Sequence, residues 1–302
     1  MTPTALILIT ISTLAHAFWN YLSQKSKPAA GFFELALLGA VVFFLPLLAF
    51  YAHALPAIPL SVWGWLLFTG LLQAIYFIGL AGAYRHGQLS IIYPLVRALP
   101  VLGITIISLC LGIGARLTPI GGLGIALVVL GCLFTPLPSF HSLNPRHYFN
   151  LACALALLAA SGTIGYTLVD NEALSILRTT PGLSLTPIEV AFFYLELEMI
   201  FTALALGLYI LFKPSERAVF GGQFRKRLRT AVSTGIIINT AYGLVLAAMA
   251  YVTNISYLSA FRQFSIPIGA CLGIWLQKEP AGAPKISGIT SILAGLVLIT
   301  LA

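Results

Sequence analysis

The sequence predicts an all-α integral membrane protein with ten transmembrane helices, arranged as two inverted five-helix repeats around a central cavity. Three observations support this prediction. First, 59% of the 302 residues are hydrophobic and 8% are charged, whereas a soluble domain carries about 25% charged residues. Second, the apolar stretches are long and continuous, which indicates membrane-spanning helices and not the alternating strands of a barrel. Third, one polar membrane segment occurs twice in the chain.

Ten apolar stretches are long enough to cross the bilayer core, which takes about 20 residues of helix. We expect the spans at 4–22, 32–52, 62–82, 89–111, 118–136, 149–169, 188–212, 231–250, 255–276 and 284–301. A basic, proline-containing joint divides the chain into two units, residues 1–137 and 148–302. Because each unit holds an odd number of spans, two copies of one fold must lie upside down relative to each other. Longer loops are expected at 171–187 and 213–229.

The repeated segment places an amide one helical turn before a tyrosine, with an arginine in the following span. The two copies are Gln73, Tyr76 and Arg97, and Asn239, Tyr242 and Arg262. An arginine at the centre of a span costs about 2.5–3.5 kcal/mol on insertion scales. Two arginines at matching depths therefore predict an interior site shared by the repeats. The arginines would bind a carboxylate or phosphate there, or be satisfied by helix-end carbonyls or glutamates. The amides and tyrosines would likewise contact either substrate or neighbouring helices.

Six further polar or aromatic residues are candidates for the lining of this cavity. They are His16, Trp19 and Asn20 in the first span, Tyr93 and Tyr257 near the two arginines, and Tyr166 in the sixth span. The spacings of three and four residues place the first three on one helix face. His16 would bind substrate, relay protons or make an interhelical hydrogen bond. Trp19 would stack on a ligand or belong to the core.

The seventh expected span contains three acids, Glu189, Glu196 and Glu198. Glu189 and Glu196 are seven residues apart and share a helix face, whereas Glu198 is rotated by about 200° from Glu196. Glu196 and Glu198 therefore cannot both point into the cavity. We expect Glu196 to face it, where it would pair with an arginine, bind a cationic group or carry a coupling proton. Asp170 is expected near the membrane edge.

Several other functions are disfavoured by motifs that the sequence lacks. It contains no Walker loop, no H-E-x-x-H and no G-x-S-x-G motif, and its five histidines are dispersed. We therefore expect neither enzymatic activity nor a cofactor or metal. The net charge of +8 comes from basic residues scattered over short loops, which argues against nucleic-acid binding. These loops mostly follow odd-numbered spans, so the positive-inside rule places both termini outside the cytoplasm.

The run Ala83–Arg97 resembles the junction of the third and fourth spans in the EamA family of the drug/metabolite transporter superfamily. His16–Asn20 resembles a first-span pattern in one branch of that family, and Gly165–Asp170 resembles its sixth span. Lys278–Pro280 stands where the family often has a Gly-Glu pair, whereas the equivalent 114–115 lacks the acid. The resemblance covers nearly the whole chain. It implies ten helices in two inverted repeats, alternating access to a small metabolite, and both termini in the cytoplasm, opposite to the charge count.

We therefore expect a multi-pass secondary transporter of the inner (plasma) membrane, an exporter or exchanger of a small polar metabolite such as an amino acid or organic anion. The arginines suit an anionic or zwitterionic substrate better than a simple cation. The partners would be that substrate, the lipid bilayer, a coupling proton and, as an option, a second copy in a homodimer. The alternatives are a lipid flippase or a membrane-embedded enzyme acting on a lipid-linked substrate, with His16 and Glu196 as its acid–base pair.

Overall fold

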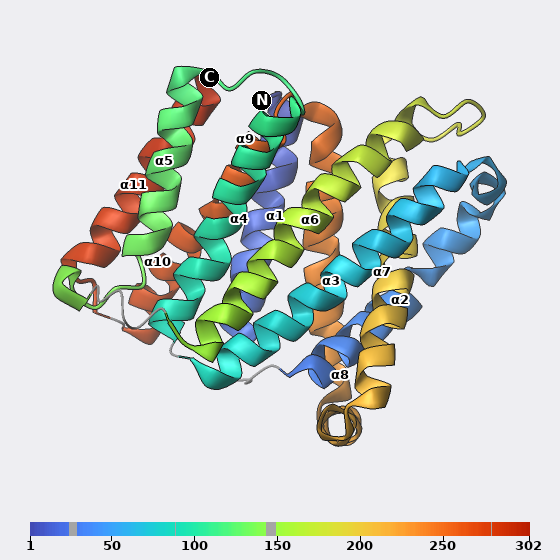
Figure 1. Cartoon of the computed structure of the whole chain (residues 1–302), viewed down its shortest axis with the longest axis horizontal. Helices are drawn as coiled ribbons and strands as arrows, with labels where there is room; N and C mark the ends of the chain where they lie inside the picture. Colours follow the sequence, from blue (N-terminus) through green and yellow to red (C-terminus); the bar gives the residue numbers. More distant parts are fainter. Residues whose placement is uncertain (24–28, 88, 143–148, 279) are drawn as a thin grey trace.

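The computed structural model describes residues 1–23, 29–87, 89–142, 149–278 and 280–302. Throughout these ranges the regular secondary structure is helical, and they contain no strand. The helices form one bundle, and both chain termini lie on the same side of it, at the top of Figure 1.

The α-helices follow the order of the predicted spans, with the ninth span broken into two helices. They are α1 (Pro3–Ser23), α2 (Ala30–Phe50), α3 (Leu60–His86), α4 (Leu89–Leu111), α5 (Pro119–Phe134), α6 (Leu151–Thr179), α7 (Pro187–Phe212), α8 (Pro214–Ala248), α9 (Ile255–Phe261), α10 (Ser265–Gln277) and α11 (Ala283–Thr300). Short 3₁₀ segments join some of them, namely η1 (Ala52–Ala57), η2 (Phe140–Ser142), η4 (Met249–Tyr251) and η5 (Arg262–Phe264).

Among the described residues, six helices are long and apolar enough to cross a bilayer. These are α2, α3, α6, α7, α8 together with η4, and α11; shorter apolar stretches occur in α1, α4 and α5. Large apolar side chains also point away from the bundle: Leu60, Trp275 and Phe212 are 86%, 82% and 80% exposed. Such a surface is stable against lipid and unfavourable in water. The chain is therefore a multi-pass membrane protein.

The two long loops expected from the sequence are largely helical. Helix α6 continues to Thr179, and α8 begins at Pro214 with a kink at Arg227, whose φ of −137° is not helical. Hydropathy reveals only the part of a helix that lies in lipid, and polar residues with good helix propensity extend it into water. The predicted loop at 213–229 was therefore wrong, and the loop at 171–187 is shortened to the segment between α6 and α7.

Local sequence signals set several helix starts. Thr186 caps α7, accepting from the backbone N–H of Glu189, while the Glu189 carboxylate accepts from the backbone N–H of Thr186. This reciprocal capping box satisfies two backbone donors that the first turn leaves without partners. The Asn150 side chain caps α6 in a simpler way, accepting from the backbone N–H of Cys153 at 2.9 Å.

Small residues allow the helices to approach closely at two interfaces. A Cβ added to Gly79 of α3 would lie 2.7 Å from the backbone of Ala159 in α6. A Cβ added to Gly124 of α5 would lie 2.7 Å from the backbone of Gly295 in α11. Close packing of this kind drives helix association in membranes, where the hydrophobic effect between helices is absent.

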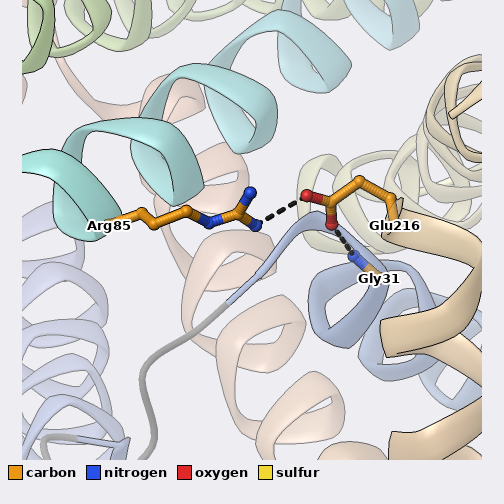
Figure 2. A network of polar contacts seen from close by, with 3 residues as sticks. All are labelled: Gly31, Arg85 and Glu216. Atoms are coloured by element: carbon orange, nitrogen blue, oxygen red, sulfur yellow. Dashed lines mark hydrogen bonds and ion pairs between the residues drawn. The ribbon is translucent and has the colours of Figure 1, made fainter. Parts of the chain in front are cut away.

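At the end of the bundle away from the chain termini, an ion pair joins three helices (Figures 1 and 2). Arg85 at the end of α3 donates to Glu216 in the first turn of α8 at 2.6 Å. The other carboxylate oxygen of Glu216 accepts from the backbone N–H of Gly31 in α2 at 3.3 Å. The contact thus fixes the relative position of α2, α3 and α8 where they leave the bundle core.

Candidate binding cavity

A central cavity lies between the two halves of the chain. The volume that the centres of water-sized molecules can occupy is about 60 Å³, and all the space between atoms, open solvent included, amounts to about 720 Å³. Its lining comes from α1, α2, α3, α4, α6, α8 and η5, and consists of Ser12, Thr13, His16, Phe33, Gln73, Tyr76, Phe77, Arg97, Tyr166, Ile238, Asn239, Ala241, Tyr242, Val245 and Arg262. Helices far apart in the sequence therefore build the site jointly.

Most of the residues that the sequence proposed for the site line this one cavity. They are His16, Gln73, Tyr76, Arg97, Tyr166, Asn239, Tyr242 and Arg262. The amide, tyrosine and arginine of each copy of the repeated segment are thus brought together. Trp19, Asn20 and Tyr93 were also proposed, but their side chains lie outside the described part of the structure.

A second hollow adjoins the first. Five residues line both hollows: His16, Tyr76, Arg97, Tyr166 and Arg262. The second hollow continues past them along the sides of α3, α4, α6 and α9. The two hollows therefore share a wall of aromatic and basic side chains.

Three tyrosines from three helices line the first hollow, and two of them, Tyr76 and Tyr166, also line the second. The rings of Tyr76 and Tyr166 meet edge to face with centroids 5.9 Å apart, and those of Tyr166 and Tyr242 do so at 5.6 Å. The guanidinium carbon of Arg262 lies 5.6 Å from the centroid of the Tyr242 ring, a cation–π distance. Because the Tyr166 ring packs against Tyr242 in turn, aromatic side chains flank Arg262 on this side of the cavity.

Arg262 lies at a break in its helix, whereas Arg97 lies within a continuous one. Helix α9 ends at Phe261, the 3₁₀ segment η5 begins at Arg262, and α10 starts at Ser265. The Ser265 hydroxyl donates to the Arg262 carbonyl at 3.0 Å and satisfies a group that the break exposes. A 3₁₀ segment inside a longer helix often marks a hinge.

Asp170, which was expected near the membrane edge, is fully buried among neighbouring helices. Its Oδ1 accepts from Thr69 of α3 at 2.6 Å and from Tyr194 of α7 at 2.9 Å. Its Oδ2 accepts from Tyr242 of α8 at 2.5 Å. The span containing it was expected to end at residue 169, whereas α6 continues for ten further residues, so Asp170 lies within the helix and not at its end.

Glu198, and not Glu196, joins the polar network of the cavity wall. Glu198 is 1% exposed, and its Oε1 accepts from the side-chain amide of Gln73. Thr202 completes the group, donating from its hydroxyl to the Gln73 amide oxygen at 3.3 Å. Neither acid belongs to the described lining of the cavity: Glu196, which was expected to face it, is absent from that lining, and Glu198 contacts the lining residue Gln73 from behind.

Glu196 faces α2 instead of the cavity. It shares a stripe of α7 with Glu189, which accepts from Tyr51 at 3.1 Å, and with Gly207, which lies against Glu34 of α2. Its side chain is fully buried, and neither carboxylate oxygen has a hydrogen-bond partner among the described residues. Since α2, α7 and α8 pack together there, Glu196 cannot reach the arginines.

Tyr257 is also absent from the lining of both described hollows. Its hydroxyl accepts from the backbone N–H of Thr118 at 3.3 Å, and its ring lies against Gly121 of α5. Tyr257 therefore packs α9 on α5, because its position on α9 turns it away from the cavity.

Sequence reasoning did not identify Thr69, Tyr194 and Thr202 as part of the site. Each is a hydroxyl residue of a kind common in membrane helices. Thr69 and Tyr194 donate to Asp170 on another helix, and Thr202 donates to the side chain of Gln73 on α3. Glu198 did carry a signal, because an acid in a span is costly. The choice between it and Glu196 required the rotation of α7, which only packing sets.

No model of a protein family matches the chain, and no curated protein is similar to it in sequence. Its fold is nevertheless similar to that of a protein of known crystal structure. That protein has 16% sequence identity with this chain, the alignment covers 99% of both chains, and the TM-score is 0.68. The likeness shows that the fold is shared along the whole length of the two chains.

Proposed function

We propose that this protein is a secondary transporter of a small anionic or zwitterionic metabolite. The observation that carries the proposal is the charge of the cavity lining. The described lining of both hollows includes Arg97, Arg262 and His16 and contains no carboxylate. The nearby acids, Asp170 and Glu198, lie behind the wall and bind neutral side chains of the lining. Such a cavity attracts a carboxylate or phosphate and repels simple cations.

The proposed architecture is two inverted repeats of five spans, corresponding to α1–α5 and α6–α11. Exchanging each helix for its counterpart leaves the packing pattern unchanged. Helices α3 and α6 pack together, as do their counterparts α8 and α1; α2 packs on α8, as α7 does on α3. In Figure 1 the counterparts α2 and α7, and likewise α5 and α11, run in opposite directions. These observations favour the inverted repeat typical of the EamA family that the sequence resembles.

The two adjoining hollows support alternating access as the mechanism. The substrate would bind where the hollows meet, at Arg97, Arg262 and the three tyrosines. Each hollow would then be the route to one side of the membrane when the other is closed. The break at Arg262 supplies a position where α9 and α10 change their relative angle, since a few residues at a helix break absorb such motions. We place the protein in the inner membrane and assign it no enzymatic reaction.

Thermal unfolding of the purified protein against a panel of small molecules tests this proposal. The panel contains amino acids, dicarboxylates, sugar phosphates, nucleotide sugars and polyamines. A ligand at a hundredfold excess over its Kd stabilises the folded state by about 2.7 kcal/mol. We expect anions or zwitterions to raise the melting temperature, and Arg97→Ala and Arg262→Ala each to abolish this shift.

Arg116→Ala is the matched control, because Arg116 is exposed outside the described cavity lining, and it should retain the shift. A stabilising compound is then tested for counterflow in proteoliposomes. Stabilisation by polyamines alone, unaffected by Arg97→Ala and Arg262→Ala, would contradict the proposed substrate class. Binding without counterflow would contradict transport.

A further inference from the structure

Behind the cavity wall, two acids from neighbouring helices lie in contact. Asp170 of α6 is fully buried and Glu198 of α7 is 1% exposed. Their carboxyl groups are close enough to interact with each other. Two ionised carboxylates are both acceptors, so a hydrogen bond between them requires one proton on one of the two.

The other contacts of the pair indicate where that proton resides. Asp170 accepts three hydroxyl hydrogen bonds, from Thr69, Tyr194 and Tyr242, an environment that suits an ionised carboxylate. Glu198 accepts only from Gln73 at Oε1, and its Oε2 meets no donor in the part of the chain that the structure describes. A buried acceptor without a donor is costly, and protonation turns Glu198 into a donor toward Asp170.

We infer that Asp170 and Glu198 form a proton-binding site that holds one exchangeable proton and is coupled to the cavity through Gln73 and Tyr242. Each of these two linking residues lines the cavity and directly contacts one of the acids. The inference rests on the proposed function only in what the proton would drive. The proton site itself rests on the contacts of the acid pair.

A route for the proton exists at Tyr242. When a hydronium ion in the cavity gives a proton to the phenol oxygen and becomes water, the original hydroxyl proton moves to Asp170 Oδ2, and Asp170 passes a proton to Glu198. Tyr242 is neutral before and after, and the charge of the acid pair changes from two negative charges to one. Because Arg262 lies over the Tyr242 ring, this change alters the field at the arginine that would bind substrate.

The surroundings of the pair contain few other ionisable groups. The titratable groups that interact with the acid pair are Tyr194 on α7 and Tyr242 on α8. Tyr242 in turn interacts with Tyr166 on α6 and with Arg262 on η5. Helix α3 contributes the neutral Thr69 and Gln73. Arg97 of α4 lies on the cavity lining, and Glu196 and Glu34 lie at the interface with α2. One proton thus decides whether the pair carries one negative charge or two.

Infrared spectroscopy of the purified protein tests the proton site without any substrate. A protonated carboxylic acid has a carbonyl stretch that shifts in deuterium oxide. We expect a band of this kind in the wild type that disappears as the pH is raised, and that is lost in Glu198→Gln. The glutamine amide can donate to Asp170 in place of the proton, so this variant should fold. Glu196→Gln is the matched control and should leave the Glu198 band in place.

Two further variants test the coupling. They also keep the proton site testable if Glu198→Gln does not fold. Asp170→Asn should shift the Glu198 band, because its charged acceptor is removed. Tyr242→Phe should displace the pH midpoint of the band, whereas Tyr76→Phe should not. An unchanged acid spectrum in Glu198→Gln, or a band that does not titrate in the folded protein, would overturn the proton site. An unchanged midpoint in Tyr242→Phe would overturn its coupling to the cavity.

The outcome for the proton site is separable from that for the proposed function. If anions stabilise the protein but the Glu198 band is missing, the transporter proposal stands and the proton site is overturned. If the band titrates as expected but no anion or zwitterion binds, the proton site stands and the substrate class is wrong.

Discussion

The two copies of the amide, tyrosine and arginine set occupy the same cavity but have different partners. Gln73 reaches across to Glu198 of α7, whereas Asn239 donates to the Gly235 carbonyl of its own helix at 2.8 Å. The Tyr242 hydroxyl binds Asp170, whereas the described contacts of Tyr76 are with aromatic rings. The repeated sequence therefore places equivalent side chains at equivalent positions, and neighbouring helices then give them different roles.

The origin of this difference is the distribution of acids. The second half supplies Asp170 on α6 and Glu198 on α7, and both are buried. In the first half, the counterpart helix α2 has Glu34 as its one acid, near its start. The acid network is therefore confined to one side of a cavity whose basic groups come from both halves. The two copies of the repeated segment therefore lie in surroundings of different charge.

Among the substitutions that test this asymmetry, Asp170→Leu is expected to cause the largest loss of stability. The substitution leaves the buried hydroxyl groups of Thr69 and Tyr194 without their acceptor, each at a cost of about 1–3 kcal/mol, and also removes the acceptor of the half-buried Tyr242. We expect the free energy of unfolding to fall by about 3 kcal/mol or more, measured by thermal or denaturant unfolding in detergent. Glu196→Leu is the control, because it removes an equally buried acid without described partners and should be neutral or stabilising. Equal losses in both variants would contradict the role assigned to Asp170.

An intermediate effect is expected at the two tyrosines. Tyr242→Phe removes a hydrogen bond to a carboxylate, which contributes about 1.5–3 kcal/mol when one partner is charged, but keeps the ring beneath Arg262. Tyr76→Phe removes a hydroxyl from the cavity lining and should change stability by about 0.5 kcal/mol or less. Paired melting curves of the two variants measure the difference. Similar destabilisation by both substitutions would show that the halves are more alike than their contacts indicate.

The smallest effect is expected where the counterpart helices α3 and α8 are joined, at the pair of Arg85 and Glu216. The Arg85 side chain is 46% exposed, so solvent and salt screen the interaction. We expect Arg85→Ala to lower stability by about 0–1 kcal/mol, with a difference from wild type that shrinks at high salt. Lys213→Ala controls for the loss of a positive charge, because Lys213 immediately precedes α8, the helix that carries Glu216. A salt-independent loss of several kcal/mol would instead make this pair a main support of the bundle.

Much of the fold could be predicted from the sequence, because apolar helices in lipid must satisfy their own backbone. Helix starts and ends were less predictable where polar residues continue a helix into water, as in α6 and α8. For the site, the cost of burying Arg97 and Arg262 was a sufficient signal, and both line the cavity. Glu196 and Tyr257 were placed there in error, because a helical periodicity gives relative angles along one helix but not its rotation toward its neighbours.

The sequence by itself determined that the chain is a membrane protein and that a polar segment occurs twice. It also predicted that both arginines lie at a shared interior site. These properties follow from composition and spacing, which act locally along the chain. Only the tertiary structure decided that Glu198 and Asp170 meet, and that Gln73 and Tyr242 connect them to the cavity. That choice depends on the tilt and rotation of α3, α6, α7 and α8, which close packing of many side chains sets together.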